Sequence, residues 1–144
     1  MNPPGKSALP AGSAGRLFLR YWLPVIVWCG LIFVQSAYPT PGKLPSWPHF
    51  DKVLHLCGYA LLGGLVCRAL ETIGSMRERR MRRFLVGLVF AALYGLTDEW
   101  HQSFVPGRSA TVGDALADLV GAGVGSAAWV MLWARLNKTK TPRS

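Results

Sequence analysis

Residues 84–118 read FLVGLVFAALYGLTDEWHQSFVPGRSATVGDALAD, and this stretch decides how the whole chain is interpreted. Residues 84–96 carry no charge, yet Asp98, Glu99 and His101 follow them within one helical turn. A Pro-Gly turn, an arginine and two further aspartates come next. Helical residues this apolar suit the interior of a membrane, where a charged side chain is costly unless protein surrounds it. The stretch therefore predicts a polar site at one end of a membrane helix.

The composition of the chain is that of a membrane protein with one domain. The 144 residues are 51% hydrophobic and only 16% charged, and the hydrophobic residues come in long blocks rather than at amphipathic spacing. The formal net charge is +9, but the basic residues cluster between the apolar blocks, as membrane topology requires. No surface for reading bases remains once those blocks lie in lipid. We therefore expect no nucleic-acid partner.

Four apolar blocks follow one another, and each is long enough to cross a membrane as a helix. A hydrocarbon core of about 30 Å needs roughly 20 helical residues. The expected helices cover about 17–37, 51–73, 84–104 and 111–136. The first block is longer than the apolar part of a typical signal peptide, so we expect it to stay uncleaved. The short loops predict antiparallel neighbours in an all-α, polytopic membrane bundle of four transmembrane helices.

Lysine and arginine counting gives this bundle an orientation. With the N-terminus inside, thirteen of the sixteen basic residues become cytoplasmic, and only Lys43, Lys52 and Arg108 face outward. Both termini are therefore expected in the cytoplasm. Trp47 and Trp100 fall near the outer interface, where tryptophan is enriched. The expected parts of the chain are a disordered lead, a four-helix membrane domain and a basic tail, at residues 1–15, 16–136 and 137–144.

Three of the expected helices carry their ionisable residues at the same, outer end. Helical geometry places those residues on one face of each helix. Glycine and alanine continue the polar stripes deeper, in residues 87–95 and 117–125, at a spacing that lets helices pack closely. The polar stripes should therefore face one another and line an outward-facing pocket. The residues expected in this ligand-binding pocket are Asp51, Lys52, His55, Tyr59, Tyr94, Asp98, Glu99, His101, Gln102, Arg108, Asp114 and Asp118.

Several of these residues also have a purely structural interpretation. Asp51 stands at the start of an apolar helical run and suits an N-cap. Thr111 and Asp114 have the spacing of a capping box, although Asp118 lies one turn deeper, where capping cannot explain it. The two histidines suit hydrogen bonds between helices as well as ligand binding. Arg108 either balances the acidic cluster or binds an anion such as a phosphate or a carboxylate.

Three segments resemble the VanZ-like family of small bacterial membrane proteins. They are DKVLHLCGYALLG at 51–63, YGLTDEWHQSFVPGRSAT at 94–111 and DALADLVGAGVG at 114–125, and the resemblance extends over roughly 20–135. It implies a multi-pass protein of the bacterial cytoplasmic (inner) membrane. The namesake of the family is linked to low-level resistance to the glycopeptide teicoplanin, a link that carries no established biochemical activity. Asp118 departs from the family pattern, which often has asparagine there.

Two functional hypotheses and one structural hypothesis follow. In the first, the protein is not an enzyme, and its pocket binds a membrane lipid, a cell-wall precursor or a glycopeptide-related ligand. Arg108 would hold the anionic part of the headgroup, and the polar residues at the end of the third block would bond to its sugar or peptide groups. In the structural hypothesis, the cluster only joins the helices to one another.

In the second functional hypothesis, the protein is a metal-assisted hydrolase or transferase that acts on a lipid-linked phosphate. Carboxylates and imidazoles suit manganese, magnesium or zinc, and a bound metal generates hydroxide near neutral pH. Glu99 would be the catalytic base. No HExxH motif supports this chemistry. A divalent metal is the one cofactor that the residues suit, and the sequence does not require it. The candidate ligands are His55, Asp98, His101 and Asp118.

Overall fold

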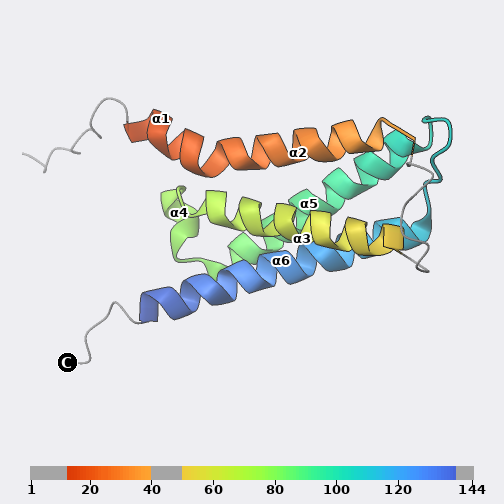
Figure 1. The fold of residues 1–144 in the computed structure, drawn as a ribbon. Coiled ribbons are helices and arrows are strands. Elements are labelled where there is room, and N and C mark those ends of the chain that lie inside the picture. The colour runs from red at the N-terminus through yellow and green to blue at the C-terminus, as the bar shows by residue number, and fades with distance from the viewer. Residues whose placement is uncertain (1–12, 40–49, 139–144) are drawn as a thin grey trace, which may run out of the picture.

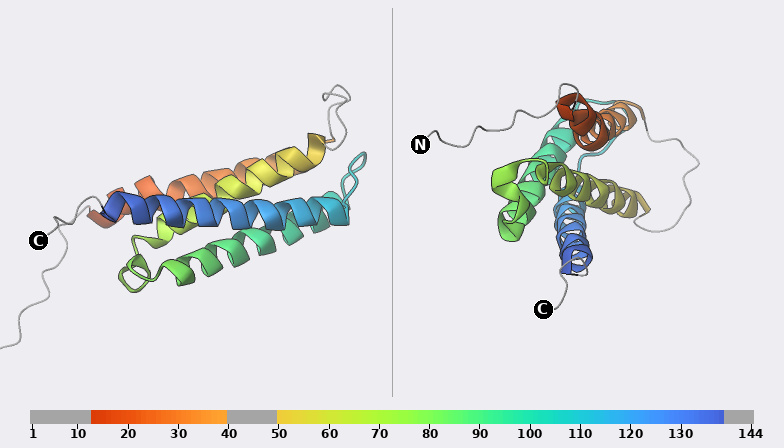
Figure 2. Two further views of the ribbon diagram at one scale, coloured as in Figure 1. Left: turned by 90° about the horizontal axis from the view of Figure 1, so that it is seen from below. Right: turned by 90° about the vertical axis from the view of Figure 1, so that its left-hand side faces the viewer.

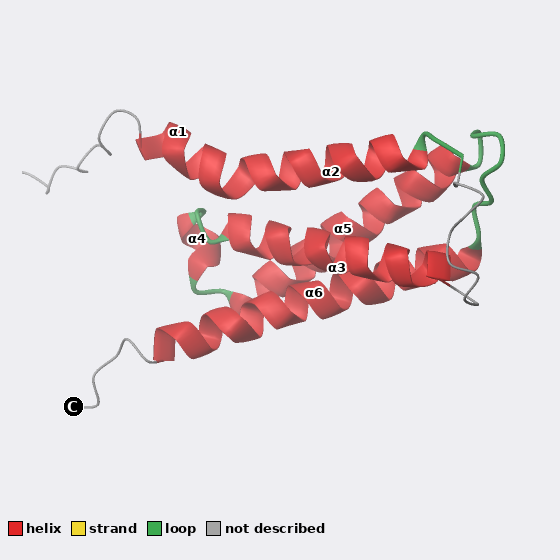
Figure 3. Cartoon of the chain, viewed as in Figure 1, coloured by secondary structure: helices red, strands yellow, loops and turns green. Residues whose placement is uncertain are grey.

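Every regular element in the described part of the chain is a helix, as Figure 1 and Figure 3 show. The computed structural model describes residues 13–39 and 50–138. The predicted all-α class is therefore confirmed. The predicted lead up to residue 12, the outer residues Lys43 and Trp47, and most of the basic tail lie outside the described residues. In chain order the elements are α1 (Ser13–Leu17), η1 (Phe18–Trp22), α2 (Leu23–Ser36), α3 (Phe50–Leu70), α4 (Gly74–Arg77), α5 (Arg80–Gln102) and α6 (Val112–Lys138).

The elements α1, η1 and α2 run on as one long helix, which starts at Ser13 rather than at the expected residue 17 (Figure 1). Its middle segment, η1, is a π-helix, in which the Leu23 N–H donates to the Phe18 carbonyl five residues back. Pro24 explains this widened turn, because a proline has no N–H to donate and its ring crowds the carbonyl four residues earlier. The helix thus passes its proline without a break.

The other three long helices form a tight group, and the first helix lies along one side of it. The most extensive contact joins α3 to α6, and α5 packs against both of them. The contacts of α2 with α3 and α5 are smaller. The right-hand view of Figure 2 shows α2 and α6 on opposite sides of α3. Because α3 takes part in the most extensive contact and lies between α2 and α6, it is the central element of the fold.

Three helical stretches of the described chain are long and apolar enough to cross a membrane, judged by length and composition: Ala14–Ser36, Phe50–Leu70 and Val112–Asn137. The membrane class of the fold is therefore confirmed. The 23 residues of α5 are not among these stretches. Arginines at its start, and Asp98 and Glu99 near its end, shorten its apolar part. A fourth crossing by α5, like the orientation of the bundle, stays a prediction.

The bounds of α3 and α5 differ from the sequence prediction. Helix α3 ends at Leu70 rather than near Ile73, because the chain turns there, with the Ile73 N–H donating to the Leu70 carbonyl three residues back. Helix α5 begins at Arg80 rather than near residue 84, since arginine is a good helix former, and it ends slightly early at Gln102. Neither difference moves a predicted site residue out of its helix.

Small residues let α3 and α6 approach until their backbones touch. A Cβ atom added at Gly121 would collide with the Leu56 carbonyl, and one added at Gly125 would collide with the Ala60 carbonyl. On α5, the small residues at 87, 91 and 95 are buried likewise. Without side chains in the way, helices can pack this closely inside a membrane. The predicted close packing along the small residues of α5 and α6 is thereby confirmed.

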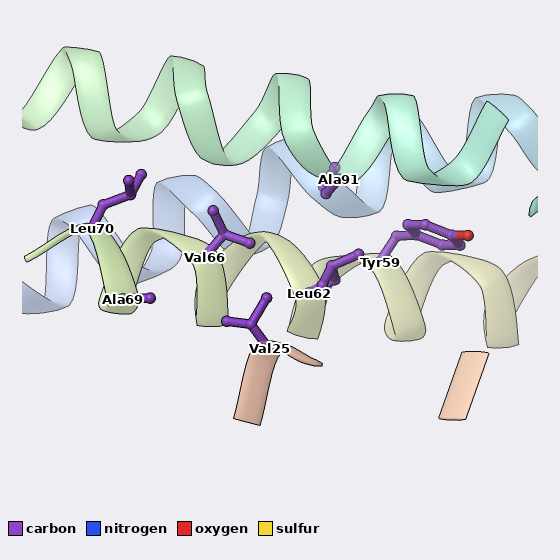
Figure 4. Packing of buried hydrophobic residues seen from close by; sticks show 8 residues of the cluster. Val25, Tyr59, Leu62, Val66, Ala69, Leu70 and Ala91 are labelled. Atoms are coloured by element: carbon purple, nitrogen blue, oxygen red, sulfur yellow. The ribbon is translucent and has the colours of Figure 1, made fainter. Parts of the chain in front are cut away.

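The hydrophobic core is small and follows α3. Figure 4 shows Val25 of α2 on one side of α3 and Ala91 of α5 on the other. Many large apolar side chains remain exposed on the outer faces of all the long helices. That distribution suits a protein whose surface is covered by lipid rather than by water. The buried apolar residues are Val25, Tyr59, Leu62, Val66, Ala69, Leu70, Ala91 and Ala122.

A buried ion pair, which the sequence did not predict, joins the start of α5 to the end of α3, far from Asp98 and Glu99. Arg83 is fully buried, and its Nη1 donates to Glu71 Oε1 at 2.8 Å. Trp129 Nε1 donates to the same oxygen at 2.7 Å, and the Arg83 guanidinium lies 4.2 Å from the centre of the Trp133 ring. Arg83, one of the basic residues expected on the cytoplasmic side, therefore also has a role in holding the helices together.

Gly125→Ala should destabilise the protein, because its methyl group would overlap the Ala60 carbonyl. Overpacking of this kind typically costs about 1–3 kcal/mol, so the midpoint of thermal unfolding in detergent should fall. Gly30→Ala is the matched control, since nothing lies within 4 Å of a Cβ atom at Gly30 and alanine is the better helix former. Equal unfolding midpoints for the two variants would contradict the close approach.

Candidate functional site

The start of α3, the end of α5 and the start of α6 form the end of the molecule that is predicted to face outward, and each contributes a residue to one cluster. His55 Nδ1 of α3 lies 2.9 Å from Asp118 Oδ1 of α6 and 3.7 Å from Glu99 Oε1 of α5. The side chains of His55, Asp118 and Glu99 are 12%, 1% and 10% exposed. Gly95 makes room for Asp118, because a Cβ atom there would lie 2.9 Å from Asp118 Oδ2. These three residues are called the His55 cluster.

A second set of contacts lies nearer to the helix ends. Lys52 Nζ lies 3.0 Å from Asp114 Oδ1 and 3.2 Å from Asp51 Oδ2. Thr111 Oγ1 donates to Asp114 Oδ2 at 2.6 Å and accepts from the Asp114 N–H at 3.2 Å, which confirms Thr111 as the N-cap of α6. In a capping box the N–H of the N-cap residue donates to the side chain of the third helical residue, here Asp114. The Thr111 N–H instead donates to Glu99 Oε2 at 3.0 Å. Asp114 therefore bonds to the N-cap of α6 and, through Lys52, joins α6 to α3.

Two sets of hydrogen bonds tie α5 to the first helix. Gln102 Nε2 donates to Asp98 Oδ2 at 3.0 Å and to Ser36 Oγ at 3.3 Å, and all three side chains are buried. Tyr94 Oη donates to the Cys29 carbonyl at 2.7 Å. Gln102 and Tyr94 therefore join α5 to α2, whereas the bond between Gln102 and Asp98 lies within α5.

Arg108 fixes the loop between α5 and α6 to the end of the first helix. Its Nε donates to the Tyr38 carbonyl at 3.0 Å, and its Nη2 donates to the Gln35 carbonyl at 2.5 Å. Gly107, with a φ of 81°, adopts a conformation that favours glycine and turns the chain just before Arg108. Arg108 therefore has a role in joining this loop to the first helix that the sequence did not predict, and both its balancing of the acidic cluster and its binding of an anion stay predictions.

His101 and Asp51 have different surroundings from those the sequence suggested. The His101 ring stacks on Phe33 with ring centres 4.7 Å apart, and its buried Nε2 makes no hydrogen bond. Helix α3 begins at Phe50, so Asp51 lies inside the first turn and is not the N-cap. A carboxylate in the first turn still interacts favourably with the helix dipole. Its side chain is 55% exposed, which leaves it at the rim of the site.

A cavity of about 460 Å³ lies between the first helix, α3 and the end of α5. This volume is in the range of small-molecule binding sites. The buried Tyr59 hydroxyl lies beside the Asp98 carboxylate on its wall. The cavity therefore contains part of the predicted pocket, with the rest of the predicted residues around it. The predicted residues that line it are Asp51, His55, Tyr59, Asp98 and Arg108.

Sequence reasoning missed the wall that the first helix provides. Trp28 lines the cavity and donates from Nε1 to the Gly58 carbonyl at 2.9 Å, and its place in the apolar block did not predict this role. Leu31 and Gln35 continue this wall along α2. The available signal was a pair of polar residues, Gln35 and Ser36, at the end of an otherwise apolar block.

A protein-family model described as VanZ/LLP1 matches residues 21–134 of the chain. The chain belongs to the VanZ/LLP1 family. No curated protein and no solved structure matches the chain. The matched residues contain α2, α3, α5 and nearly all of α6, together with the whole His55 cluster and the cavity. The resemblance that the sequence motifs indicate is therefore confirmed.

In this VanZ/LLP1 protein, the His55 cluster is also a group of metal-ligand type. His55, Glu99 and Asp118 each offer one ligand atom, and the three atoms lie within 4.8 Å of one another. Two of the four predicted metal ligands, Asp98 and His101, are not in this group, and the predicted base Glu99 stands in their place. Adjacent helical residues point about 100° apart. That rotation turns Glu99 toward α3 and α6, whereas Asp98 accepts a hydrogen bond from Gln102 of its own helix and lines the cavity.

Thr111→Val should loosen the start of α6 in this VanZ/LLP1 protein, because valine lacks the hydroxyl that bonds Asp114 twice. Loss of an N-cap costs about 1 kcal/mol, and the first turn of α6 should exchange its amide hydrogens faster in a mass-spectrometric measurement. Thr97→Val is the control, since Thr97 Oγ1 donates to the Tyr94 carbonyl within its own helix. Wild-type exchange rates in Thr111→Val would show that the cap has no role.

Proposed function

We propose that this protein binds an amphipathic component of the bacterial cell envelope, an envelope lipid or a lipid-linked cell-wall precursor, in the cavity beside α2 and α3. The observation that carries this proposal is the two-sided wall of the cavity. Leu31 and Leu54 line the apolar side and are also 53% and 46% exposed on the outer surface, where lipid would lie. Asp98 and His55 line the polar side. A molecule with an acyl chain and a polar headgroup matches both sides.

The polar side of the cavity favours a headgroup that donates hydrogen bonds. Asp51 and Asp98 contribute carboxylate oxygens, which act only as acceptors when ionised. Tyr59 places a buried hydroxyl on the same wall, beside the Asp98 carboxylate. Arg108 already gives donors to two backbone carbonyls. The hydroxyl groups of a sugar, or the ammonium group of an amine or peptide, therefore match this wall better than an isolated phosphate does.

Positive-inside counting supports an outward opening of this cavity. The basic residues of the described chain concentrate near the end of the bundle away from the His55 cluster, and such residues are enriched on the cytoplasmic side of membranes. The cavity would then lie on the outer side of the cytoplasmic membrane, in reach of envelope components. The teicoplanin link of the family's namesake fits this placement by association, and an effect on glycopeptide susceptibility belongs to the proposal as an expectation.

A metal-assisted hydrolase or transferase is the second candidate function. The observation in its favour is that His55 belongs both to the metal-ligand group and to the wall of the cavity. A lipid-linked phosphate bound in the cavity would lie beside that group, and Glu99 would serve as the base. Turnover of such a substrate by the purified protein would separate this candidate from simple binding.

Gly58→Leu should abolish ligand binding while the protein still folds. Gly58 lines the cavity, and a Cβ atom at this position meets nothing within 4 Å, so a leucine side chain has open space to fill. With a panel of envelope lipids and lipid-linked precursors, the wild type should show a saturable rise in unfolding temperature for one lipid class. Its native mass spectrum should retain the same class. Gly58→Leu should show neither effect.

Gly30→Leu is the matched control, because position 30 is equally open, lies on the first helix and does not line the cavity. Asp98→Asn adds a test of headgroup chemistry, since it removes a charge and keeps the size of the side chain. It should weaken the binding of amine-bearing lipids more than that of neutral sugar lipids. The proposal would be wrong if the wild type gave no saturable shift across the panel, or if Gly58→Leu gave the same shift as the wild type.

A further inference from the structure

The His55 cluster has the composition and spacing of a metal site. Its three ligand atoms are one imidazole nitrogen and two carboxylate oxygens, and they come from three different helices. Ligands held by zinc at about 2.0–2.2 Å in a tetrahedron lie roughly 3.3 Å apart. The distances from His55 Nδ1 are 2.9 Å to Asp118 Oδ1 and 3.7 Å to Glu99 Oε1, so they lie on either side of that value.

Two carboxylate oxygens of the cluster are buried and have no hydrogen-bond partner. They are Glu99 Oε1 and Asp118 Oδ2, on side chains that are 10% and 1% exposed. The other oxygen of each group is already engaged, by the Thr111 N–H and by the His55 ring. Burying a carboxylate oxygen without a hydrogen-bond partner costs free energy. The cost is higher for an unpaired charge inside a membrane. These two oxygen atoms therefore indicate a positively charged partner from outside the chain, such as a bound metal ion.

The charge of the cluster calls for two positive charges. Two carboxylates, those of Glu99 and Asp118, face one imidazole, which carries at most a single positive charge. Lys52, at the same end of α3, is already paired with Asp51 and Asp114. A divalent cation beside a neutral imidazole balances both carboxylates at once.

The neighbours of the cluster hold its ligands in position. The Thr111 N–H binds the second oxygen of Glu99, and Asp118 packs against the bare backbone at Gly95. The His55 ring lies nearly parallel to that of Tyr59, with ring centres 6.4 Å apart and an angle of 11° between the planes. Partners of this kind orient metal ligands and strengthen metal binding. The cluster is therefore arranged in advance for an ion.

We propose that His55, Glu99 and Asp118 bind one divalent transition-metal ion. A nitrogen ligand with two carboxylates suits zinc or manganese better than magnesium or calcium, which prefer oxygen ligands alone. The site goes beyond the proposed binding of an envelope component, because only His55 is common to the cluster and the cavity. Metal binding would fix the His55 side chain, and with it one part of the cavity wall.

The test uses the full chain, purified in detergent, stripped of metal and titrated with zinc, manganese, magnesium and calcium. Zinc and manganese should bind saturably, one ion per chain, and magnesium and calcium far more weakly. Manganese bound to the wild type should show nitrogen coupling from a histidine in pulsed electron paramagnetic resonance. His55→Gln should remove that coupling. Glu99→Gln and Asp118→Asn should each weaken manganese binding by about tenfold or more.

His101→Gln is the matched control, because the His101 ring stacks on Phe33 outside the cluster, and this variant should keep both affinity and nitrogen coupling. Gly58→Leu should also keep them, so a failure of the cavity proposal is seen separately. Circular dichroism and gel filtration check the fold of each variant. If Asp118→Asn misfolds, the affinity of Glu99→Gln and the loss of nitrogen coupling in His55→Gln test the proposal instead. The proposal is overturned if the wild type binds neither zinc nor manganese, or if His101→Gln loses as much as His55→Gln. The cluster would then be an ion-pair network centred on His55.

Discussion

The contact between the backbones of α3 and α6 is the constraint on which the rest of the structure depends. Gly121 has no side chain, so the Leu56 carbonyl lies directly against α6. This contact fixes how the two helices are aligned, and it brings His55 to 2.9 Å from Asp118. A larger residue at Gly121 would push the helices apart and break the hydrogen bond between His55 and Asp118. Inside a membrane, such groups have no water to replace the lost partner.

The sequence motifs predict where the polar residues gather, but they do not predict which of them meet. Three helix ends with acids and histidines at matching depth were enough to bring His55, Glu99 and Asp118 to one end of the helix group, but not to predict the cavity wall that α2 provides. The cap formed by Thr111 and Asp114 was predictable because it depends only on local spacing. Which residue of α5 lies near His55 depends instead on the rotation of α5, because neighbouring residues of a helix point about 100° apart. Because Glu99 and Asp98 both suit a buried polar face, spacing alone could not choose between them.

Longer-range contacts set the same limit elsewhere in the molecule. Trp28 stands in the middle of an apolar block with no polar neighbour, and its role depends on the Gly58 carbonyl of another helix. Arg83 is one of several arginines in a basic run, and what distinguishes it is that its buried guanidinium bonds to Glu71 and lies on the Trp133 ring. Such roles arise from pairs of residues that are far apart in the chain. A single sequence shows the composition of each block, which fixes the membrane class, but not these pairings.

Whether His55 and Asp118 meet inside the helix group is tested most directly by a double-mutant cycle. The free energy of unfolding in detergent, with a chelator present, would be measured for the wild type, His55→Gln, Asp118→Asn and the double variant. If the two side chains meet as described, the single changes should be non-additive by about 0.5–3 kcal/mol, because each strands a buried partner. Additive effects, within about 0.3 kcal/mol, would contradict the contact and with it the arrangement of both proposed sites.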